Sequence, residues 1–180
     1  METTNKEILR GGQFLVKETN CEDIFTPEDF SEEQIMMKDA VKEFTDREIV
    51  AHRDRFEAKD YALTEEVMKK AGELGFLGVA VPEEYGGMGI SDYRYNAIFN
   101  EELGYTGCAS IAIGYSLHSD IVTPYIEHYG SEALKQKYLP KMASGELIGS
   151  IAMTEPGAGS DLQNIKTSAI DKGDHYLVNG

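Results

Sequence analysis

IGSIAMTEPGAGSDLQN, residues 148–164, is where the pattern of the chain changes from helical to extended. An apolar run, Ile148–Met153, leads into a turn of small residues, which is typical of a strand that enters a turn. Gly157 and Gly159 lack a Cβ, so a ligand can lie against their backbone, and both tolerate a positive φ. Successive N–H groups in such a turn can bind an anion. We therefore expect a strand edge and a glycine turn that hold a flat polar ring and its phosphates; an ordinary surface turn without a ligand is the alternative.

Other nucleotide and nucleophile motifs fit this chain less well. GAGSDL, residues 157–162, begins like GxGxxG, but it ends in Leu162, and the β-branched run 165–170 follows where the dinucleotide motif needs a helix. Ser160 adds a hydroxyl, and Asp161 is expected to cap the chain locally. Neither GxxxxGK[ST] nor GxSxG occurs. A Rossmann-type module with a parallel sheet is therefore disfavoured.

Charge and cysteine content restrict the partners and the compartment. The chain has 180 residues and a net charge of −15, from 32 acidic and 17 basic residues. Nucleic acids and anionic membranes are disfavoured, because binding phosphates needs a basic face. Cys21 and Cys108 lie far apart without metal-ligand spacing, so neither a metal site nor a disulfide is expected. Without a long apolar run or a leader-like N-terminus, we expect no membrane span and a cytoplasmic protein.

Helical spacing dominates from Ser31 to about residue 146. Ser31 and Gln34 form a capping box that predicts a helix over about 32–58. A second helix is expected from Thr64 to Gly75, and a third from Ser91 to just before Gly104. A buried helix is expected over 109–114, and the next one passes through Pro124 with a kink or a new start. The last helix is expected to run from Ser131 until Pro140 stops it. FLGVAV, residues 76–81, is expected to connect two helices across the core.

From about residue 147 the apolar period becomes 2, which predicts strands over 166–170 and 175–178 around the turn 171–174. Asn179-Gly180 is a strong hairpin signal with no strand after it, so we expect a fragment of a longer protein. The expected fold is α+β, an N-terminal all-α bundle followed by the start of an antiparallel β domain. The parts are an N-terminal arm (1–30), a helical domain (31–146) and the start of a middle β domain (147–180).

Two histidines are poor candidates for catalysis. His118, Ser119 and Asp120 contain the residue types of a catalytic triad, but neighbouring residues on one helix point in different directions. His52 lacks a second ligand type one helical turn away, so we expect a surface residue rather than a ligand.

Several separate segments resemble the acyl-CoA dehydrogenase family. They are AMTEPGAGSD (Ala152–Asp161), GFLGVAVPEEYGGMG (75–89) and YGSEALKQKYLPKMASGELIGSIAMTEPGAGSDLQNIKTSA (129–169), and they follow one another in the family's order. The resemblance covers about residues 30–180. SLHSDIV (116–122) and SDLQNIKT (160–167) are most similar to the long-chain branch.

The resemblance implies an FAD enzyme that oxidises an acyl-CoA thioester to the trans-2-enoyl-CoA, with an electron-transfer flavoprotein as acceptor. A carboxylate removes the α proton and the flavin N5 accepts the β hydride. Carried over by position, Ile151–Ser160 would line the flavin: Ile151, Ala152, Met153, Thr154, Glu155, Pro156, Gly157, Ala158, Gly159 and Ser160. Thr154 would bond the pyrimidine end, the N–H groups near Gly157–Ser160 would face the pyrophosphate, and Ser160 would also lie near the acyl-CoA.

The family's catalytic glutamate, its C-terminal helical bundle and its aromatic-Ile-Thr strand would lie beyond Gly180, so we expect no catalytic residue in this chain. Glu155 does not occupy the position of the base. The full-length protein is expected to be a homo-oligomer, a homotetramer by the resemblance. A flavin oxidase or monooxygenase of the same fold and a flavin-free helical interaction domain are the alternatives. Oxygen consumption or a colourless protein, respectively, would identify them.

Overall fold

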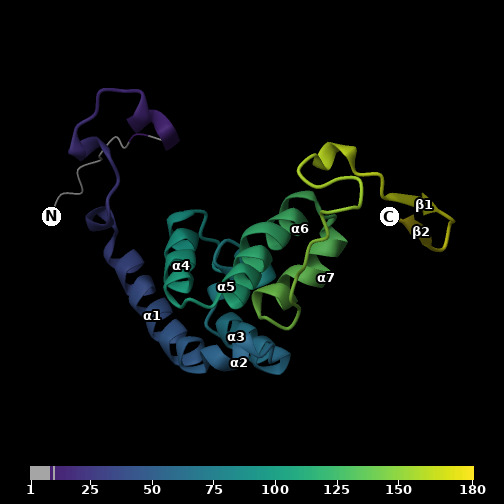
Figure 1. Ribbon diagram of the computed structural model, residues 1–180, viewed down its shortest axis with the longest axis horizontal. Helices are drawn as coiled ribbons and strands as arrows, with labels where there is room; N and C mark the ends of the chain where they lie inside the picture. The colour runs from purple at the N-terminus through teal and green to yellow at the C-terminus, as the bar shows by residue number, and fades with distance from the viewer. Residues whose placement is uncertain (1–8, 10) are drawn as a thin grey trace. The chain divides into compact units, whose positions relative to one another are not determined.

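The computed structural model describes residue 9 and residues 11–180, and the chain is helical from Glu32 to Ala143 (Figure 1). The first part of the expected N-terminal arm, residues 1–8 and 10, lies outside the described residues. The chain divides into two compact units. Of the described residues, the first unit comprises those up to 67 and residues 90–112, and the second comprises residues 68–89 and 113–180. The helices include α3 (Tyr61–Glu73) and α5 (Ala109–Ser116).

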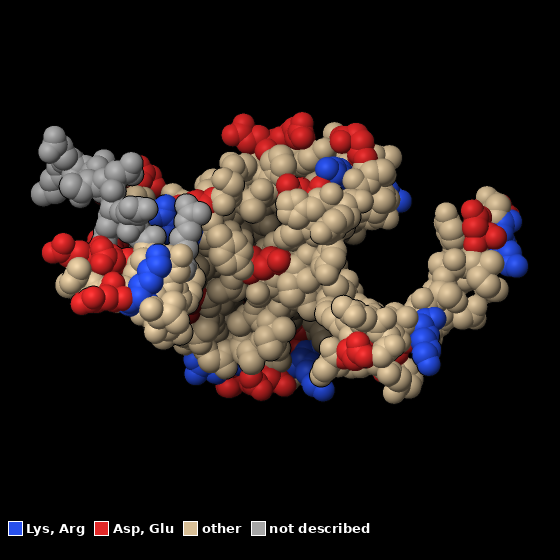
Figure 2. Space-filling view, turned by 90° about the horizontal axis from the view of Figure 1, so that it is seen from above, with Lys and Arg blue, Asp and Glu red and all other residues tan. Residues whose placement is uncertain are grey.

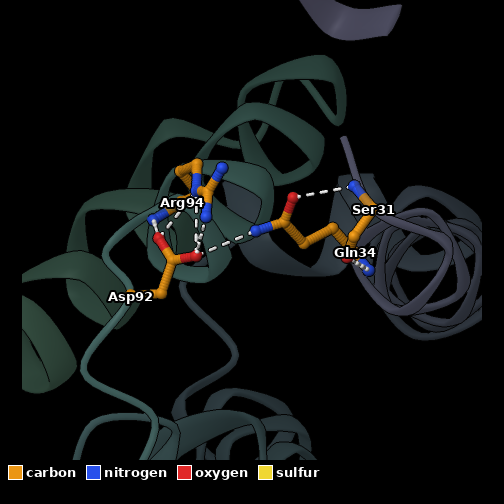
Figure 3. A network of polar contacts seen from close by, with 4 residues as sticks. All are labelled: Ser31, Gln34, Asp92 and Arg94. Atoms are coloured by element: carbon orange, nitrogen blue, oxygen red, sulfur yellow. Dashed lines mark hydrogen bonds and ion pairs between the residues drawn. The ribbon is translucent and has the colours of Figure 1, made fainter. Parts of the chain in front are cut away.

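Helix α1 (Glu32–Glu48) packs against α4 (Arg94–Tyr105) in the first unit. The predicted capping box is confirmed: the Ser31 hydroxyl accepts from the Gln34 N–H at 3.2 Å, and the Gln34 carbonyl oxygen accepts from the Ser31 N–H at 3.1 Å. Gln34 also donates to Asp92 at 3.0 Å, and Asp92 pairs with Arg94 (Figure 3). The start of α1 is thereby bonded to the start of α4.

The end of the arm packs on the same corner of this unit. The rings of Phe25 and Phe30 meet edge to face at 5.1 Å, and the Arg94 guanidinium lies 5.5 Å from the Phe25 ring centre. Phe25 thus packs on this corner, whereas Phe14, Leu15 and Val16 of the arm are exposed.

The single helix predicted over 32–58 is wrong, because the chain turns at Ile49. Its backbone leaves helical geometry at φ −112°, and a 3₁₀ turn (Val50–His52) leads into α2 (Arg53–Glu57). The turn lets both Ile49 and Phe56 be buried. Arg53 then donates to the Thr106 carbonyl, which ties α2 to the end of α4.

Two predicted helix starts are also wrong, because a nearby aspartate does the capping. Helix α3 begins before Thr64, and the Asp60 carboxylate accepts from the Leu63 N–H at 3.1 Å. Helix α4 begins after Ser91, and Asp92 accepts from the Arg94 N–H at 3.0 Å. Aspartate and serine are similarly good caps, so neighbouring candidates compete.

Helix ends follow glycine geometry only in part. Gly75 terminates α3 as predicted, with a left-handed φ of 79°. The prediction that α4 ends before Gly104 is wrong, because the helix continues to Tyr105, and the left-handed residue is Gly107, at φ 68°.

The second unit contains the buried connection 76–81, the end of α5 and helices α6 (Thr123–Tyr129) and α7 (Glu132–Ala143). The connection is confirmed: it contains a 3₁₀ turn (Phe76–Gly78), and Phe76, Leu77, Val79 and Val81 are buried. A second 3₁₀ turn (Glu83–Tyr85) follows it. Val81, Tyr85 and Leu139 pack together, with Ile126 against them.

Helix α5 is less buried than the sequence predicted. Ile111 and Tyr115 are buried, but Ile113 is 65% exposed, because the helix packs one face only. A six-residue π-helical turn (Leu117–Val122) follows it directly, and α6 starts anew with Pro124 in its first turn, as predicted.

Ser131 caps α7, as predicted, and Gly130 ends α6, but Pro140 does not stop α7. The helix continues to Ala143, although an interior proline lacks one N–H and costs about 3 kcal/mol. Leu139, Met142 and Ala143 are all buried on its far half, so packing holds this last turn.

The strands β1 (Ser168–Asp171) and β2 (Tyr176–Asn179) form the predicted antiparallel hairpin. Ala169 lies opposite Val178, and Asp171 lies opposite Tyr176. The turn closes through Lys172 N–H to the His175 carbonyl at 2.9 Å, with Gly173 at φ 95°. The observed fold is thus the expected one, a helical bundle followed by antiparallel strands.

Acidic side chains occur in separate groups on the face shown in Figure 2, rather than in one tract. Among the described residues, we find no helix that combines the length and the apolar character needed to cross a membrane.

Candidate functional site

The segment that leads into the glycine turn is anchored to two helical elements of the second unit. Leu147 donates its N–H to the Lys141 carbonyl at 3.0 Å, and Gly149 donates its N–H to His118 Nδ1 at 2.9 Å. A Cβ on Gly149 would lie 2.8 Å from Val122 Cγ1 and 3.1 Å from Met142 Cε. A methyl group at Gly149 would therefore force Val122 or Met142 to shift.

Residues Ile151–Thr154, which we call the exposed edge, follow this anchor. Ala152, Met153 and Thr154 are exposed and Ile151 is half-buried. The prediction of a strand over 148–153 is wrong for the chain as described, because these residues form no regular secondary structure and pair with no other strand. Among the described residues, the backbone N–H and C=O groups of the exposed edge have no hydrogen-bond partner. Such groups are available to a ligand or another strand.

A tight turn follows the edge. Glu155 N–H donates to the Ala158 carbonyl at 2.9 Å, and Ala158 N–H donates back to the Glu155 carbonyl at 3.1 Å. Ala158 is the one buried residue within 151–160, at 4% exposed, and it seats the turn. Pro156 and Gly157 form its exposed tip.

The Glu155 carboxylate is a structural clamp. Its oxygens accept the backbone N–H of Lys166 at 2.9 Å and of Thr167 at 2.7 Å, and also the Thr167 hydroxyl. The Thr167 hydroxyl first, and then the two N–H groups, hold the pKa of Glu155 below its usual value. These bonds favour a carboxylate that stays ionised and fastens the turn to the residues before β1.

Gly157 and Gly159 face open space. A Cβ built on either glycine would meet no atom within 4 Å, and neither has a positive φ. Their tolerance of a positive φ is therefore not used in this structure. Neither the backbone geometry nor crowding within the described chain explains why these two residues are glycines. A ligand that lies against their Cα atoms would explain it.

Ser160 and Asp161 complete the turn. Ser160 is exposed and has no partner among the described residues, so its hydroxyl is available. Asp161 precedes a 3₁₀ turn (Leu162–Asn164), but its side chain accepts from the Asn164 side chain and caps no backbone N–H. The expected Asp161 cap is thus replaced by a side-chain pair.

His118 is the functional candidate that sequence reasoning missed. Its ring is fully buried, with Nε2 3.1 Å from the Met142 carbonyl and Nδ1 accepting from Gly149. Burial lowers the pKa of His118, and the hydrogen bond to Met142 opposes this shift. The available signal was a histidine within a run of small and apolar residues, 108–119, that contains no other charge-bearing side chain.

The rejected triad is absent from the structure. His118 bonds Met142 and Gly149, Ser119 donates to the Leu77 carbonyl at 3.4 Å, and the Asp120 carboxylate accepts from Ser116 at 3.1 Å. The other histidine, His52, is half-buried on the 3₁₀ turn after α1, and its Nδ1 is shielded without a partner among the described residues.

Comparison with known proteins shows the family to which the chain belongs. Residues 31–146, more than half of the chain, match the family model for the N-terminal domain of acyl-CoA dehydrogenases. The chain belongs to the acyl-CoA dehydrogenase family.

Among acyl-CoA dehydrogenases, a probable acyl-CoA dehydrogenase of Bacillus subtilis (strain 168) is 39% identical over 176 residues, 97% of this chain and 29% of the relative. The mitochondrial long-chain specific acyl-CoA dehydrogenase of Mus musculus is 42% identical over 151 residues, 84% of this chain and 34% of the relative. The crystal structure of a Bacillus anthracis acyl-CoA dehydrogenase complexed with FAD superposes with a TM-score of 0.85 at 38% identity, over 96% of this chain and 29% of that one. The chain thus spans about a third of the length of these relatives.

Proposed function

We propose that the protein carrying this chain is an FAD-dependent acyl-CoA dehydrogenase that oxidises an acyl-CoA thioester to the trans-2-enoyl-CoA. The proposed electron acceptor is an electron-transfer flavoprotein. We further propose that the protein is a cytoplasmic homo-oligomer, a homotetramer, and that it acts in fatty acid β-oxidation. Membership of the family supports the reaction. The FAD complex of the Bacillus anthracis relative supports the cofactor.

The observation that carries the proposal is the open face over Gly157 and Gly159. Both glycines lie in an exposed turn, and no atom of the described chain approaches where their Cβ would be. Next to them, the exposed edge offers backbone donors and acceptors that have no partner in the described part of the chain. A flat polar ring can lie against the edge while its phosphates approach the glycine backbone. The residues present therefore fit the group.

The proposed binding residues are Ile151, Ala152, Met153, Thr154, Glu155, Pro156, Gly157, Ala158, Gly159 and Ser160. FAD, when bound, supplies the acceptor for the electron pair and proton removed from the β carbon. The Thr154 hydroxyl would donate to the pyrimidine end, and donors aimed at a group that gains charge stabilise the charged form. The N–H groups of Gly157–Ser160 would face the pyrophosphate, and Ser160 would also contact the acyl-CoA.

The general base is proposed to come from outside these residues. Glu155 lies in the right segment, but its oxygens accept from Lys166 and Thr167. A general base must reach the proton it removes. The contribution of Glu155 is instead to hold the turn.

The test is made on the full-length protein that contains this chain. We expect a flavin absorbance with close to one FAD per subunit and anaerobic bleaching of that absorbance by an acyl-CoA. Gly159→Ala should weaken FAD binding about tenfold or more, because a methyl group enters the space over the turn. Gly104→Ala, on an exposed open position of α4, is the matched control and should leave FAD binding unchanged. A colourless protein would reject the proposal.

A further inference from the structure

We propose that His118 is a positioning residue for the cofactor: through Gly149 it holds the exposed edge, Ile151–Thr154, in place against the flavin. This inference rests on the proposed function, because it assigns a second residue to the same edge. His118 comes from the π-helical turn and not from the segment that would touch the flavin.

The ring bridges two parts of the second unit that are far apart in the sequence. Its partners, Met142 at the end of α7 and Gly149 before the edge, are 24 and 31 residues away. The turn that carries it is itself closed by the Thr123 hydroxyl, which donates to the His118 carbonyl at 2.7 Å. The imidazole is therefore held on both sides and at its own backbone.

One protonation state satisfies both bonds. A backbone N–H can only donate, so Nδ1, which faces Gly149, must carry no proton. The neutral ring then carries its proton on Nε2 and donates it to the Met142 carbonyl. A doubly protonated ring would point a second N–H at the N–H of Gly149, and the bond to the edge would be lost.

The edge depends on this bond because little else fixes it. The Gly149 N–H makes the last backbone hydrogen bond before Glu155, and the backbone of the edge between them has no partner among the described residues. Gly149 itself fits tightly between Val122 and Met142. Release of Gly149 therefore frees the whole stretch up to the glycine turn.

The titratable groups nearest along the contacting segments bond other partners. On the helical side, Asp120 accepts from Ser116, and Tyr115 donates to the Phe76 carbonyl. Lys141, next to Met142, pairs with Glu146 at 2.8 Å in the segment before Gly149. A proton that enters this site is thus taken up by the imidazole, without a carboxylate bonded to it.

The test compares His118→Gln and His118→Leu in the full-length flavoprotein. Glutamine keeps an acceptor oxygen for Gly149 and a donor for Met142 but does not titrate, whereas leucine removes both bonds. Two quantities are measured: hydrogen exchange of the peptide that contains Gly149, divided by the exchange rate of the unprotected peptide at the same pH, and the rate of FAD release. Each is followed from about one unit above to about two units below the ordinary histidine pKa of about 6.5. Tyr115→Phe, which removes another buried hydrogen bond of the same unit, is the control for general destabilisation.

In the wild type we expect the relative exchange rate and the rate of FAD release each to rise about tenfold toward acid, the effect of one lost hydrogen bond. His118→Gln should keep the neutral-pH rates and lose the rise, His118→Leu should be fast at every pH, and Tyr115→Phe should match the wild type. Unchanged exchange at Gly149 in His118→Leu overturns the proposal, and so does faster exchange with unchanged FAD release. If the wild type binds no FAD, the proposed function fails, and with it the cofactor role of His118. Exchange at Gly149 then still decides whether His118 holds Gly149.

Discussion

Glu155 illustrates how one carboxylate can be a conspicuous residue of a site without doing its chemistry. It is the acidic residue in the middle of the segment that resembles the family signature, yet both of its oxygens are occupied by the backbone and side chain before β1. Its lowered pKa follows from those bonds. A carboxylate that holds a turn by accepting hydrogen bonds works best when it stays ionised, whereas a general base must take up a proton.

Glu155→Gln should therefore leave abstraction of the α proton intact in the full-length protein. The amide keeps one acceptor but turns the other position into a donor that faces an N–H, so the attachment of the turn to residues 166–167 weakens. The measurement is exchange of the substrate α proton with solvent, together with the FAD content of the purified variant. Loss of exchange at normal FAD content would contradict the assignment and make Glu155 the base.

Two glycines of the site, eight residues apart, should respond in opposite ways to the same methyl group. Gly149→Ala brings a Cβ to 2.8 Å from Val122 and 3.1 Å from Met142, and we expect a loss of about 1–3 kcal/mol in the free energy of unfolding, as for other overpacked sites. Gly157→Ala meets nothing within 4 Å and should change that free energy by less than about 0.5 kcal/mol.

Both variants are compared by chemical denaturation of the apoprotein, so that ligand binding does not enter. Equal losses for the two variants would show that Gly157 is held by contacts of its own. A loss of FAD affinity in Gly157→Ala without a loss of stability is the pattern expected of a glycine kept for a ligand.

At the scale of elements, the sequence correctly predicted features that depend on hydrogen bonds between residues close together in the chain. The Ser31–Gln34 capping box, the end of α3 at Gly75 and the hairpin around Gly173 all depend on residues within a few positions of each other, and all are present. The period-2 pattern placed both strands within about two residues of their observed bounds.

The wrong starts of α3 and α4 come from neighbouring aspartates, but two other misses at this scale depend on distant packing. Pro140 stays inside α7 because Leu139, Met142 and Ala143 are buried around it, and α1 turns at Ile49 because the turn buries Ile49 and Phe56. The role of His118 could not be predicted, since both of its partners lie more than twenty residues away. Of the site, the small-residue turn was predicted, but its histidine anchor was not.

Helix α4 offers a matched pair of substitutions at its carboxyl end. Gly104 lies within the helix with open space beside it, so Gly104→Ala should raise the free energy of unfolding by about 0.5–1 kcal/mol. Gly107 has φ 68°, and a Cβ there would lie 3.6 Å from the Arg53 guanidinium, so Gly107→Ala should lower the free energy by about 1 kcal/mol.

Thermal or urea unfolding of the two single variants and of the double variant measures both terms. The two effects should nearly cancel in the double variant if the sites act independently. A destabilising Gly104→Ala would mean that the end of α4 is frayed or is covered by another part of the full-length protein.

At the scale of the whole molecule, the pKa shifts set the direction of the pH dependence of stability. The hydrogen bonds of Leu63 and Arg55 lower the pKa of Asp60, the Arg94 side chain lowers that of Asp92, and burial lowers that of His118. The unfolded chain therefore binds more protons than the folded one as the pH falls. The His118 contribution is complete above its unfolded-state pKa and is lost as the pH falls from there through the lowered folded-state value; the carboxylate contributions are lost further into acid.

Acid should thus destabilise the protein in two stages, and His118→Gln separates them. Since glutamine does not titrate, the variant should lose the part of the decline that begins near the ordinary histidine pKa of about 6.5 and keep the part below about pH 4. The measurement is the free energy of unfolding from denaturant titrations across this range. An identical decline in variant and wild type would mean that another group takes up the proton in the first stage.

The last prediction concerns the 180-residue chain on its own. Nine of the ten proposed binding residues are exposed or half-buried, and the exposed edge has no partner strand among the described residues, so the isolated chain offers one side of a flavin site. A cofactor held on one side keeps much of its surface in water, whereas most ligand sites bury at least about 70% of the ligand. We therefore expect the isolated chain to be poorly soluble and to retain little or no FAD, while the full-length protein retains it. The comparison is made by absorbance after gel filtration in the presence of added FAD. Stoichiometric yellow FAD on the isolated chain would mean that residues 147–180 form a complete site. The residues that cover the second side of the flavin would then have to be sought within this chain.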